Sequence, residues 1–246
     1  MAEDGKVFTL PRRLDTPEDG AEALKLLARG AEAELYLVEW GGRLAVLKRR
    51  VPKPYRHRVI DDALRFRRTL VEARMLVRAL ELGLSVPLLY EVRLSDAEII
   101  MEYVEGRSLR WYIEECGLDE VAVDAVKRLG WMIGVLHEHG FVHGDVTTSN
   151  IIVTGRGSYK LIDFGLSGSS DDEEDKAVDV HLFLRAVEST HPEYADSLYK
   201  LFLEGYGEAR GREKAEMVAG LVSKIRLMGR YVEERRRRRM VWEGLH

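Results

Sequence analysis

The sequence predicts an α+β fold in which a small β-rich N-terminal lobe with one long helix precedes a larger, mainly helical C-terminal lobe. Strand-type alternation dominates the first part of the chain, a single long segment of helical period interrupts it, and helical periods dominate after residue 102. The 246 residues suit one large domain or two lobes, and 46% hydrophobic content is enough to form real cores. We therefore expect lobes at residues 1–102 and 103–246.

The N-terminal lobe is expected to contain a hairpin, one long helix and two further strands. Residues 1 to about 23 are expected to form a strand or a loop that leads into the lobe. The strand-type runs are residues 35–40, 44–48, 87–92 and 98–102. The pair Gly41-Gly42 between the first two runs indicates a tight hairpin. Residues 59–82 have helical periodicity, and Gly83 is a suitable residue to end that helix.

The C-terminal lobe is expected to be built mainly from helices. A helix is predicted over residues 124–139 and ends at Gly140. Two short strands around a glycine-containing turn follow, at residues 151–153 and 159–162. Helices are predicted from about residue 176 to the end, and the change of character near residues 103–106 is the expected hinge.

Composition and charge narrow the class of protein. The net charge is −4, so we do not expect a protein that coats nucleic acid, and no DNA partner is expected. The single cysteine, Cys116, excludes an intrachain disulfide and fits a reducing compartment. Residues 1–6 lack the features of a secretory signal, and no apolar run approaches the ~20 residues that span a bilayer. We expect a soluble, cytoplasmic protein without a membrane partner.

The chain is strongly depleted in amide side chains. It has no glutamine and a single asparagine, Asn150, while Glu and Arg are abundant. This composition is typical of proteins from hyperthermophiles, although genomic base bias produces a similar pattern. The retention of one asparagine makes its position informative.

Asn150 lies five residues after Asp145 and thirteen before the sequence Asp163-Phe164-Gly165. This order and spacing are typical of phosphotransferase catalytic loops. In that chemistry a carboxylate faces the acceptor oxygen, while an amide oxygen and a second carboxylate bind divalent metal. Magnesium prefers such oxygen ligands.

Two residues of the N-terminal lobe complete the pattern. Period-two alternation places Val46 and Lys48 on the same face of a strand, so an apolar wall and a phosphate-binding ammonium would be adjacent. Glu72 shares the apolar stripe of its helix with Met75 and Leu76, so it should face inward. A buried carboxylate needs a partner, and Lys48 is the expected one.

Taken together, these motifs resemble the protein-kinase superfamily, and within it the small atypical kinase or ATPase subunit of the KEOPS complex, which helps make threonylcarbamoyl-adenosine on tRNA. The resembling segments are residues 30–33, 53–57, 68–73, 143–150, 162–167, 174–179 and 189–192, with the arginine-rich end. The resemblance implies a bilobal protein-kinase-like fold and serine/threonine kinase or ATPase activity with ATP and Mg²⁺. It also implies the KEOPS catalytic subunit, other KEOPS subunits and tRNA as partners.

The resemblance also assigns roles to single residues. Lys48 and Glu72 would position the α- and β-phosphates, and Asp145 would orient the attacking oxygen. Asn150 and Asp163 would bind the metal. The residues implied in nucleotide binding are Gly30, Ala31, Glu32, Val46, Lys48, Met101, Glu102, Tyr103, Asn150 and Asp163.

The chain departs from ordinary protein kinases around the phosphate-covering loop and the catalytic loop. Glu32 and Leu35 stand where further glycines of that loop are expected, and Glu32 adds a negative charge near the phosphates. Gly144 replaces the usual arginine of the catalytic loop, so no guanidinium is present there to bind a phosphorylated activation loop.

The segment after the catalytic loop is unusually short. Only thirteen residues separate Gly165 from Asp179, and no Ala-Pro-Glu sequence is present. The platform that docks peptide substrates is therefore expected to be missing. The acidic residues 171–175 are expected to form a solvated loop, or alternatively a docking patch or repulsive gate. Asp179 is expected to accept hydrogen bonds from backbone amides of the catalytic loop.

Basic residues indicate a surface for phosphate groups. The run Arg235, Arg236, Arg237, Arg238 and Arg239 is expected to contact RNA, the alternative being a solvated, frayed terminus. Lys53 and Arg56 are further candidates for phosphate contact.

Three other functions remain open from the sequence. One is a RIO-type atypical kinase in ribosome assembly, which shares the short loop near Gly30. Another is a non-catalytic RNA-binding scaffold that holds nucleotide only as a structural ligand. A small-molecule phosphotransferase of the aminoglycoside type needs a larger acceptor lobe than these residues supply.

Overall fold

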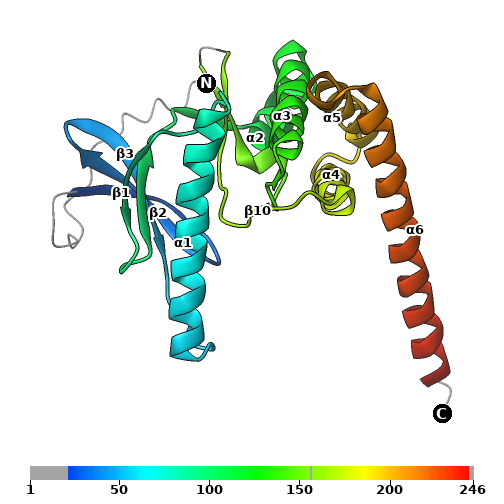
Figure 1. Ribbon diagram of the computed structural model, residues 1–246, viewed down its shortest axis with the longest axis horizontal. Coiled ribbons are helices and arrows are strands. Elements are labelled where there is room, and N and C mark those ends of the chain that lie inside the picture. The colour runs from blue at the N-terminus through cyan, green and yellow to red at the C-terminus, as the bar shows by residue number, and fades with distance from the viewer. Residues whose placement is uncertain (1–21, 156, 244–246) are drawn as a thin grey trace, which may run out of the picture. The chain divides into compact units, whose positions relative to one another are not determined.

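The computed structural model describes residues 22–155 and 157–243, which form two compact units. Of the described residues, 22–78 and 87–104 belong to the first unit. The second unit comprises Ala79–Val86 and the described residues from Glu105 to 243. One unit is a sheet with a long helix and the other is mainly helical (Figure 1), so the α+β class is confirmed.

The first unit contains a five-stranded antiparallel sheet in the order β1-β2-β3-β5-β4. Its strands are β1 (Glu22–Arg29), β2 (Ala33–Trp40), β3 (Arg43–Arg50), β4 (Leu89–Arg93) and β5 (Glu98–Glu102). Gly41 and Gly42 join β2 to β3 with φ angles of 56° and 73°. A two-residue hairpin turn needs this left-handed backbone, which glycine adopts without steric cost. The predicted hairpin is confirmed.

The sequence pattern did not predict strand β1, because the expected lead-in of residues 1 to about 23 lies almost entirely outside the described residues and ends where the strand begins. Its pairing with β2 shifts register twice, between Ala23 and Lys25 and between Leu26 and Ala28. Each shift breaks the alternation of inward and outward side chains. The pattern of period two is therefore absent from this strand although the strand is present.

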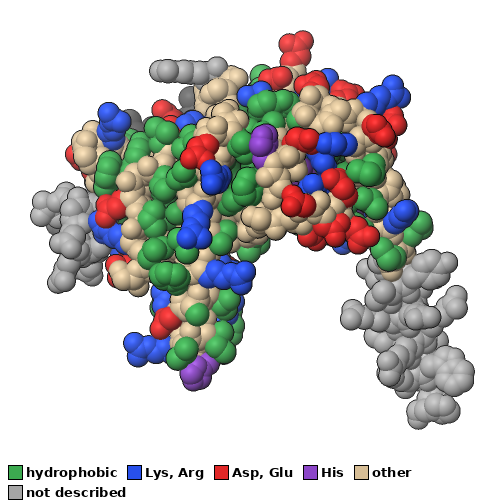
Figure 2. Space-filling view, viewed as in Figure 1, with side chains coloured by type: hydrophobic (Ala, Val, Ile, Leu, Met, Phe, Trp, Pro, Cys, Tyr) green, Lys and Arg blue, Asp and Glu red, His purple; other side chains and the backbone are tan. Residues whose placement is uncertain are grey.

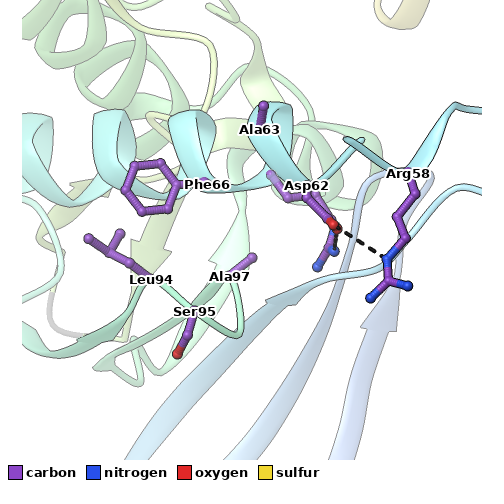
Figure 3. A pocket seen from close by; sticks show the side chains of 8 residues that line it. Arg58, Asp62, Ala63, Phe66, Leu94, Ser95 and Ala97 are labelled. Carbon is purple, nitrogen blue, oxygen red and sulfur yellow. Dashed lines mark hydrogen bonds and ion pairs between the residues drawn. The ribbon is translucent and has the colours of Figure 1, made fainter. Parts of the chain in front are cut away.

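Helix α1 (Arg58–Glu81) ends where the sequence indicated. Gly83 has a φ of 74°, and the N–H of Leu84 donates to the carbonyl of Ala79 at 2.9 Å. A left-handed glycine just after a helix satisfies its last carbonyls in this way. A cavity of about 520 Å³ lies between α1 and the β4–β5 turn, with Phe66 and Leu94 among its lining (Figure 3).

The second unit contains five α-helices after residue 105 and several short strands among its described residues. The helices are α2 (Leu109–Cys116), α3 (Glu120–Glu138), α4 (Glu173–Thr190), α5 (Ala195–Arg210) and α6 (Arg212–Glu243). Strands β6 (Gly106–Ser108), β8 (Ile151–Thr154) and β9 (Tyr159–Leu161) form one sheet, and β7 (Phe141–Val142) pairs with β10 (Gly168–Ser169). The 3₁₀ turn η1 (Thr148–Asn150) precedes β8.

Helices α3 and α5 approach closely through glycines. A Cβ at Gly130 would lie 2.0 Å from the carbonyl oxygen of Phe202, and one at Gly205 would lie 1.9 Å from that of Lys127. Helix α3 starts before the predicted residue 124, because the Asp119 side chain caps it by accepting from the N–H of Ala122 at 2.9 Å.

Helix α6 packs on α4 and α5 through its first half, where Val218 and Val222 are buried. The run Arg235–Arg239, the predicted RNA contact, falls in α6, but its side chains lie outside the described part of the structure. Within the described residues, every helix is too short or too polar to cross a membrane.

In the acidic run, residues 171 and 172 are the exposed, non-helical residues that we expected, but residues 173–175 form the first turn of helix α4. Asp172 caps the helix by accepting from the N–H of Glu174 at 2.9 Å. Negative charge at this position also interacts favourably with the helix dipole. Glu173 binds the buried guanidinium of Arg210 at 2.8 Å, and Ser170 donates to Asp175 at 2.6 Å. Part of the run thus has a structural role.

The Glu173–Arg210 pair predicts a specific pH dependence of stability. Hydrogen bonding from Arg210 lowers the pKa of Glu173 from 4.5 to about 2. Because the folded pKa lies below the unfolded one, the stabilisation is complete above pH 4.5 and is lost as the pH falls towards 2. Urea unfolding of the wild-type chain and of Glu173→Gln, followed from pH 7 downward, should show a difference that shrinks below about pH 4.5. A difference that is independent of pH would contradict this account.

Candidate active site

Asn150 and Asp145 are joined by two hydrogen bonds within residues 143–150, the segment predicted to be the catalytic loop and called so below. The Asn150 Nδ2 donates to the backbone oxygen of Asp145 at 2.9 Å and to its Oδ2 at 2.8 Å. Both partners only accept, so the nitrogen must face them and the amide Oδ1 must point elsewhere. No donor of the described residues reaches that Oδ1. Asn150 therefore presents one uncharged oxygen as a possible metal ligand.

Asp163 lies at the same end of the β8–β9 hairpin as Asn150. In this hairpin Ile151 is opposite Leu161, and the N–H of Ile162 donates to the carbonyl of Asn150 at 2.9 Å. Asp163 has a φ of 63°, a left-handed conformation that aspartate tolerates better than most residues but that still costs free energy. Such strain occurs mainly at functional sites, where the surrounding structure imposes it.

The oxygen donors of Asn150 and Asp163 fit Mg²⁺ better than a softer metal. Magnesium commonly takes one or two protein ligands and completes its octahedron with water and substrate phosphates. Among residues 22–155 and 157–243 no three His, Cys, Asp or Glu side chains are grouped as a metal site.

The backbone of the catalytic loop is held by Asp179, which is only 2% exposed. Its carboxylate accepts from the N–H of His143 at 2.6 Å and from the N–H of Gly144 at 2.8 Å. The predicted role of Asp179 is thereby confirmed. Burial acts to raise the pKa of Asp179, but hydrogen bonding with His137 and with the loop outweighs burial and the pKa is lowered. The loop is thus held by a charged acceptor.

A chain of hydrogen bonds from helix α5 orients the side chain that supports Asp179. Arg210 donates to the Tyr206 hydroxyl at 2.8 Å, and that oxygen lies 2.8 Å from Nδ1 of His137. Burial lowers the pKa of His137 and raises that of Tyr206 to about 12, so the imidazole is neutral and the hydroxyl keeps its proton. Tyr206 then donates to Nδ1, and the proton on Nε2 points at Asp179, 3.1 Å away.

Glycine at position 144 replaces the usual arginine, and the backbone there also leaves no room for a side chain. Its φ is 80°, and a Cβ there would lie 2.3 Å from the carbonyl oxygen of Leu166. A side chain would therefore displace the segment that follows Asp163. Two more contacts hold that segment on the loop: Ser167 donates to the carbonyl of His143 at 3.0 Å, and Phe164 packs on the His143 ring at 4.8 Å.

In the first unit, Lys48 and Glu72 make the contact that we expected. The Lys48 Nζ lies 2.6 Å from Oε1 of Glu72, and both side chains are buried. Arg50 was not among the predicted site residues, yet its Nη2 lies 2.6 Å from Oε2 of the same carboxylate. Period-two alternation places Arg50 on the same strand face as Lys48, so the signal was present in the sequence.

The turn at Gly30 is closed by a backbone hydrogen bond, and Glu32 within it makes ion pairs. The N–H of Gly30 donates to the carbonyl of Ala33 at 2.9 Å. The carboxylate of Glu32 pairs with Arg68 and with Arg56, the latter at 3.5 Å. Glu32 was predicted to bind nucleotide, and Arg56 to contact phosphate. In the structure the two side chains bind one another.

The remaining predicted nucleotide-binding residues lie on β3 and β5 or next to them. Val46 and Met101 are opposite one another in the sheet, and both are half-buried. Glu102 accepts the N–H of Leu88 at 3.1 Å, and Tyr103 follows it. None of the predicted residues lines either described cavity, at α1 (Figure 3) or between α5 and α6.

On the face shown in Figure 2, Lys and Arg side chains are spaced along α1, whereas Asp and Glu side chains gather near α4.

Comparisons with known proteins support a kinase-like fold. Residues 86–194 match the protein kinase domain family. A KEOPS complex subunit Bud32 of Pyrococcus abyssi is 41% identical over 216 residues, which are 85% of this chain and 97% of that protein. A solved structure of the Rio2 kinase–ADP/Mg²⁺-phosphoaspartate complex from Chaetomium thermophilum has a TM-score of 0.56 at 18% identity, covering 80% of this chain and 69% of the other. This likeness confirms the predicted protein-kinase-like fold.

A third relative is a probable bifunctional tRNA threonylcarbamoyladenosine biosynthesis protein of Methanothermobacter thermautotrophicus. It is 38% identical over 85% of this chain, which spans only 37% of that longer protein. The Pyrococcus protein, by contrast, is matched over nearly its whole length.

The hydrogen-bond chain behind Asp179 predicts that Tyr206→Phe is destabilising. The change leaves Nδ1 of the buried His137 without a donor, which should cost about 1–3 kcal/mol of unfolding free energy. Tyr199→Phe on the same helix is the matched control, because the Tyr199 hydroxyl makes no hydrogen bond to the described residues. Urea unfolding of both variants measures the difference. An equal loss in the two would show that the Tyr206 hydroxyl does not support the network.

Proposed function

The chain belongs to the Bud32 family of KEOPS complex subunits, and on that premise we propose that it is an atypical Mg²⁺-dependent ATPase and serine/threonine kinase that supports threonylcarbamoyladenosine modification of tRNA. The observation that carries the proposal is the orientation of Asn150. Its nitrogen is committed to Asp145, and its oxygen stands at the same end of the hairpin as Asp163. This arrangement supplies the oxygen ligands and the carboxylate that phosphoryl transfer requires.

In this proposal Asn150 Oδ1 and the Asp163 carboxylate hold Mg²⁺. Bound magnesium would neutralise charge on the phosphate oxygens. Asp145 orients the attacking oxygen and accepts its proton, while the bond from Asn150 to Oδ2 fixes the direction of that carboxylate and the bond to the backbone oxygen of Asp145 fixes the amide. The amide thus has two roles, as a metal ligand and as a support for Asp145.

The first unit supplies the group that binds the α- and β-phosphates. Lys48 is a compact ammonium with three N–H donors, and its bond to Glu72 fixes its direction. Val46 on the same strand face, and Met101 opposite it, offer apolar surface to the adenine ring. We include Gly30, Ala31 and Tyr103 in nucleotide binding on the strength of the family resemblance.

Water is the favoured acceptor in this proposal, ahead of a range of protein hydroxyls. Strand β10 (Gly168–Ser169) pairs with β7, and helix α4 already starts at Glu173. The chain between Gly165 and α4 is therefore taken up by a strand pair and a helix cap. Little of it is left to form a docking platform for a peptide.

The partners in this proposal are the other KEOPS subunits, including the catalytic subunit, and tRNA. The arginine run 235–239 would contact phosphates of the tRNA without reading its sequence. The relative from Methanothermobacter thermautotrophicus carries tRNA threonylcarbamoyladenosine biosynthesis in its name, which supports this assignment.

The proposal predicts that Asp145→Ala lowers Mg²⁺-dependent phosphate release from ATP by about 100-fold or more, because the acceptor loses its general base and orienting group. Release should be measured with the full chain, alone and together with tRNA and the KEOPS catalytic subunit. Asp196→Ala, an exposed aspartate on α5, is the control and should release phosphate at the wild-type rate. Unchanged release by Asp145→Ala would contradict an enzymatic role.

Two further results separate the alternatives. With ATP radiolabelled at the γ-phosphate, release without protein labelling favours hydrolysis, whereas robust labelling of an added protein favours a kinase. If Asn150→Ala retains complex assembly and full tRNA modification, the chain is a scaffold and the nucleotide is a structural ligand. A working ATPase should lose turnover in Asn150→Ala.

A further inference from the structure

Arg50 is a buried cation for which the proposed function has not yet provided a role. It is 5% exposed and lies two residues beyond Lys48 on β3. Its Nη2 and the Nζ of Lys48 each lie 2.6 Å from a different oxygen of Glu72. One carboxylate on α1 is therefore bound by two cations from the same strand.

Burying two cations beside one carboxylate costs desolvation free energy. Removing a guanidinium from water carries a large desolvation penalty, and an apolar side chain of similar volume would commonly be as stable or more stable. The charge of Glu72 is already balanced by Lys48. A second cation is not required to neutralise one carboxylate. What Arg50 adds is a second bond, which fixes the direction of the Glu72 side chain.

The second bond matters when Lys48 binds a phosphate, because Glu72 could then lose the partner of its Oε1. The bond to Glu72 uses one of the three donors of the ammonium, and a phosphate would draw the ammonium towards itself. Glu72 is 1% exposed, so water does not replace a partner that moves away. Arg50 binds the other oxygen of the carboxylate, Oε2, and this bond does not depend on where the ammonium of Lys48 lies.

The backbone at Arg50 is well placed to act as an anchor. Its N–H donates to the carbonyl of Ala97 at 3.1 Å, which ties the end of β3 to the β4–β5 turn. The neighbouring Arg49 points to the other face of the sheet and binds Glu98 at 2.6 Å. Adjacent arginines on one strand thus make the same kind of bond to a buried glutamate, and only one of these glutamates also binds Lys48.

We propose that Arg50 is a positioning residue that anchors Glu72 to strand β3, so that Lys48 keeps a fixed partner with or without nucleotide. This inference rests on the proposed function, because it assigns Lys48 to phosphate binding. In this view helix α1 is held by two charge-assisted bonds, and the release of one does not free the helix.

The test compares Arg50→Met, Arg50→Lys and Arg49→Met in the full chain. Arg50→Met should weaken Mg²⁺–ADP binding and raise the KM for ATP by about tenfold, since Lys48 loses a fixed direction. Arg50→Lys should restore most of the loss, because an ammonium can still bond Oε2. Arg49→Met removes an equivalent bond elsewhere, so it should lower thermal stability but change KM by less than about twofold.

Hydrogen exchange of the α1 amides, measured without nucleotide, reports the anchoring independently of ATP chemistry. Arg50→Met should speed exchange around Glu72, and Arg49→Met should not. Wild-type KM in Arg50→Met, no rescue by Arg50→Lys, or an equal kinetic loss in Arg49→Met would overturn the proposal. If Arg50→Met does not fold, the kinetics of Arg50→Lys and Arg50→Gln decide, with loss expected only in the latter.

These readouts also separate failure of this inference from failure of the proposed function. A wild-type chain that neither binds Mg²⁺–ADP nor releases phosphate refutes the proposed function. Exchange at α1 then still shows whether Arg50 anchors Glu72.

Discussion

The buried carboxylate of Asp179 is the constraint on which the second unit depends. Its oxygens accept two backbone N–H groups of the catalytic loop and face His137, so a charge that would be costly to bury is fully hydrogen-bonded. With those two amides fixed, Gly144 takes its left-handed conformation against Leu166 and Asp145 follows at a set position. The bond from Asn150 to Oδ2 then orients the Asp145 side chain.

In the first unit, hydrogen bonds also compensate a buried carboxylate, but there they orient a side chain. Glu72 is another buried carboxylate with a donor on each oxygen, but its partners are two side chains of one strand. In the second unit the donors fix a backbone, and in the first they fix an ammonium. Glu32 is a contrast, since it is 42% exposed and its pairs with Arg56 and Arg68 are open to solvent. Such pairs contribute little to stability and exchange partners easily.

Much of this arrangement was predictable from short-range sequence signals. The Gly41-Gly42 hairpin, the end of α1 at Gly83 and the Lys48–Glu72 contact depend on local turn chemistry and on strand and helix periods. The chain from Arg210 through Tyr206 and His137 was not predictable, because Tyr206 lies 69 residues from His137 and only the packing of α5 on α3 brings them together. The role of Glu173 within the acidic run was not predictable for a similar reason, since its partner Arg210 is distant in sequence.

The most direct test of this account is phosphate release from Mg²⁺–ATP by Asp179→Asn, at a temperature where the variant remains folded. The amide of asparagine retains one acceptor oxygen and places N–H donors near donors of the loop. The account predicts a fall in turnover of about 100-fold or more, as expected when catalytic groups are misplaced by an ångström. Turnover at the wild-type rate would show that the loop holds Asp145 and Asn150 without Asp179, and would contradict the central claim.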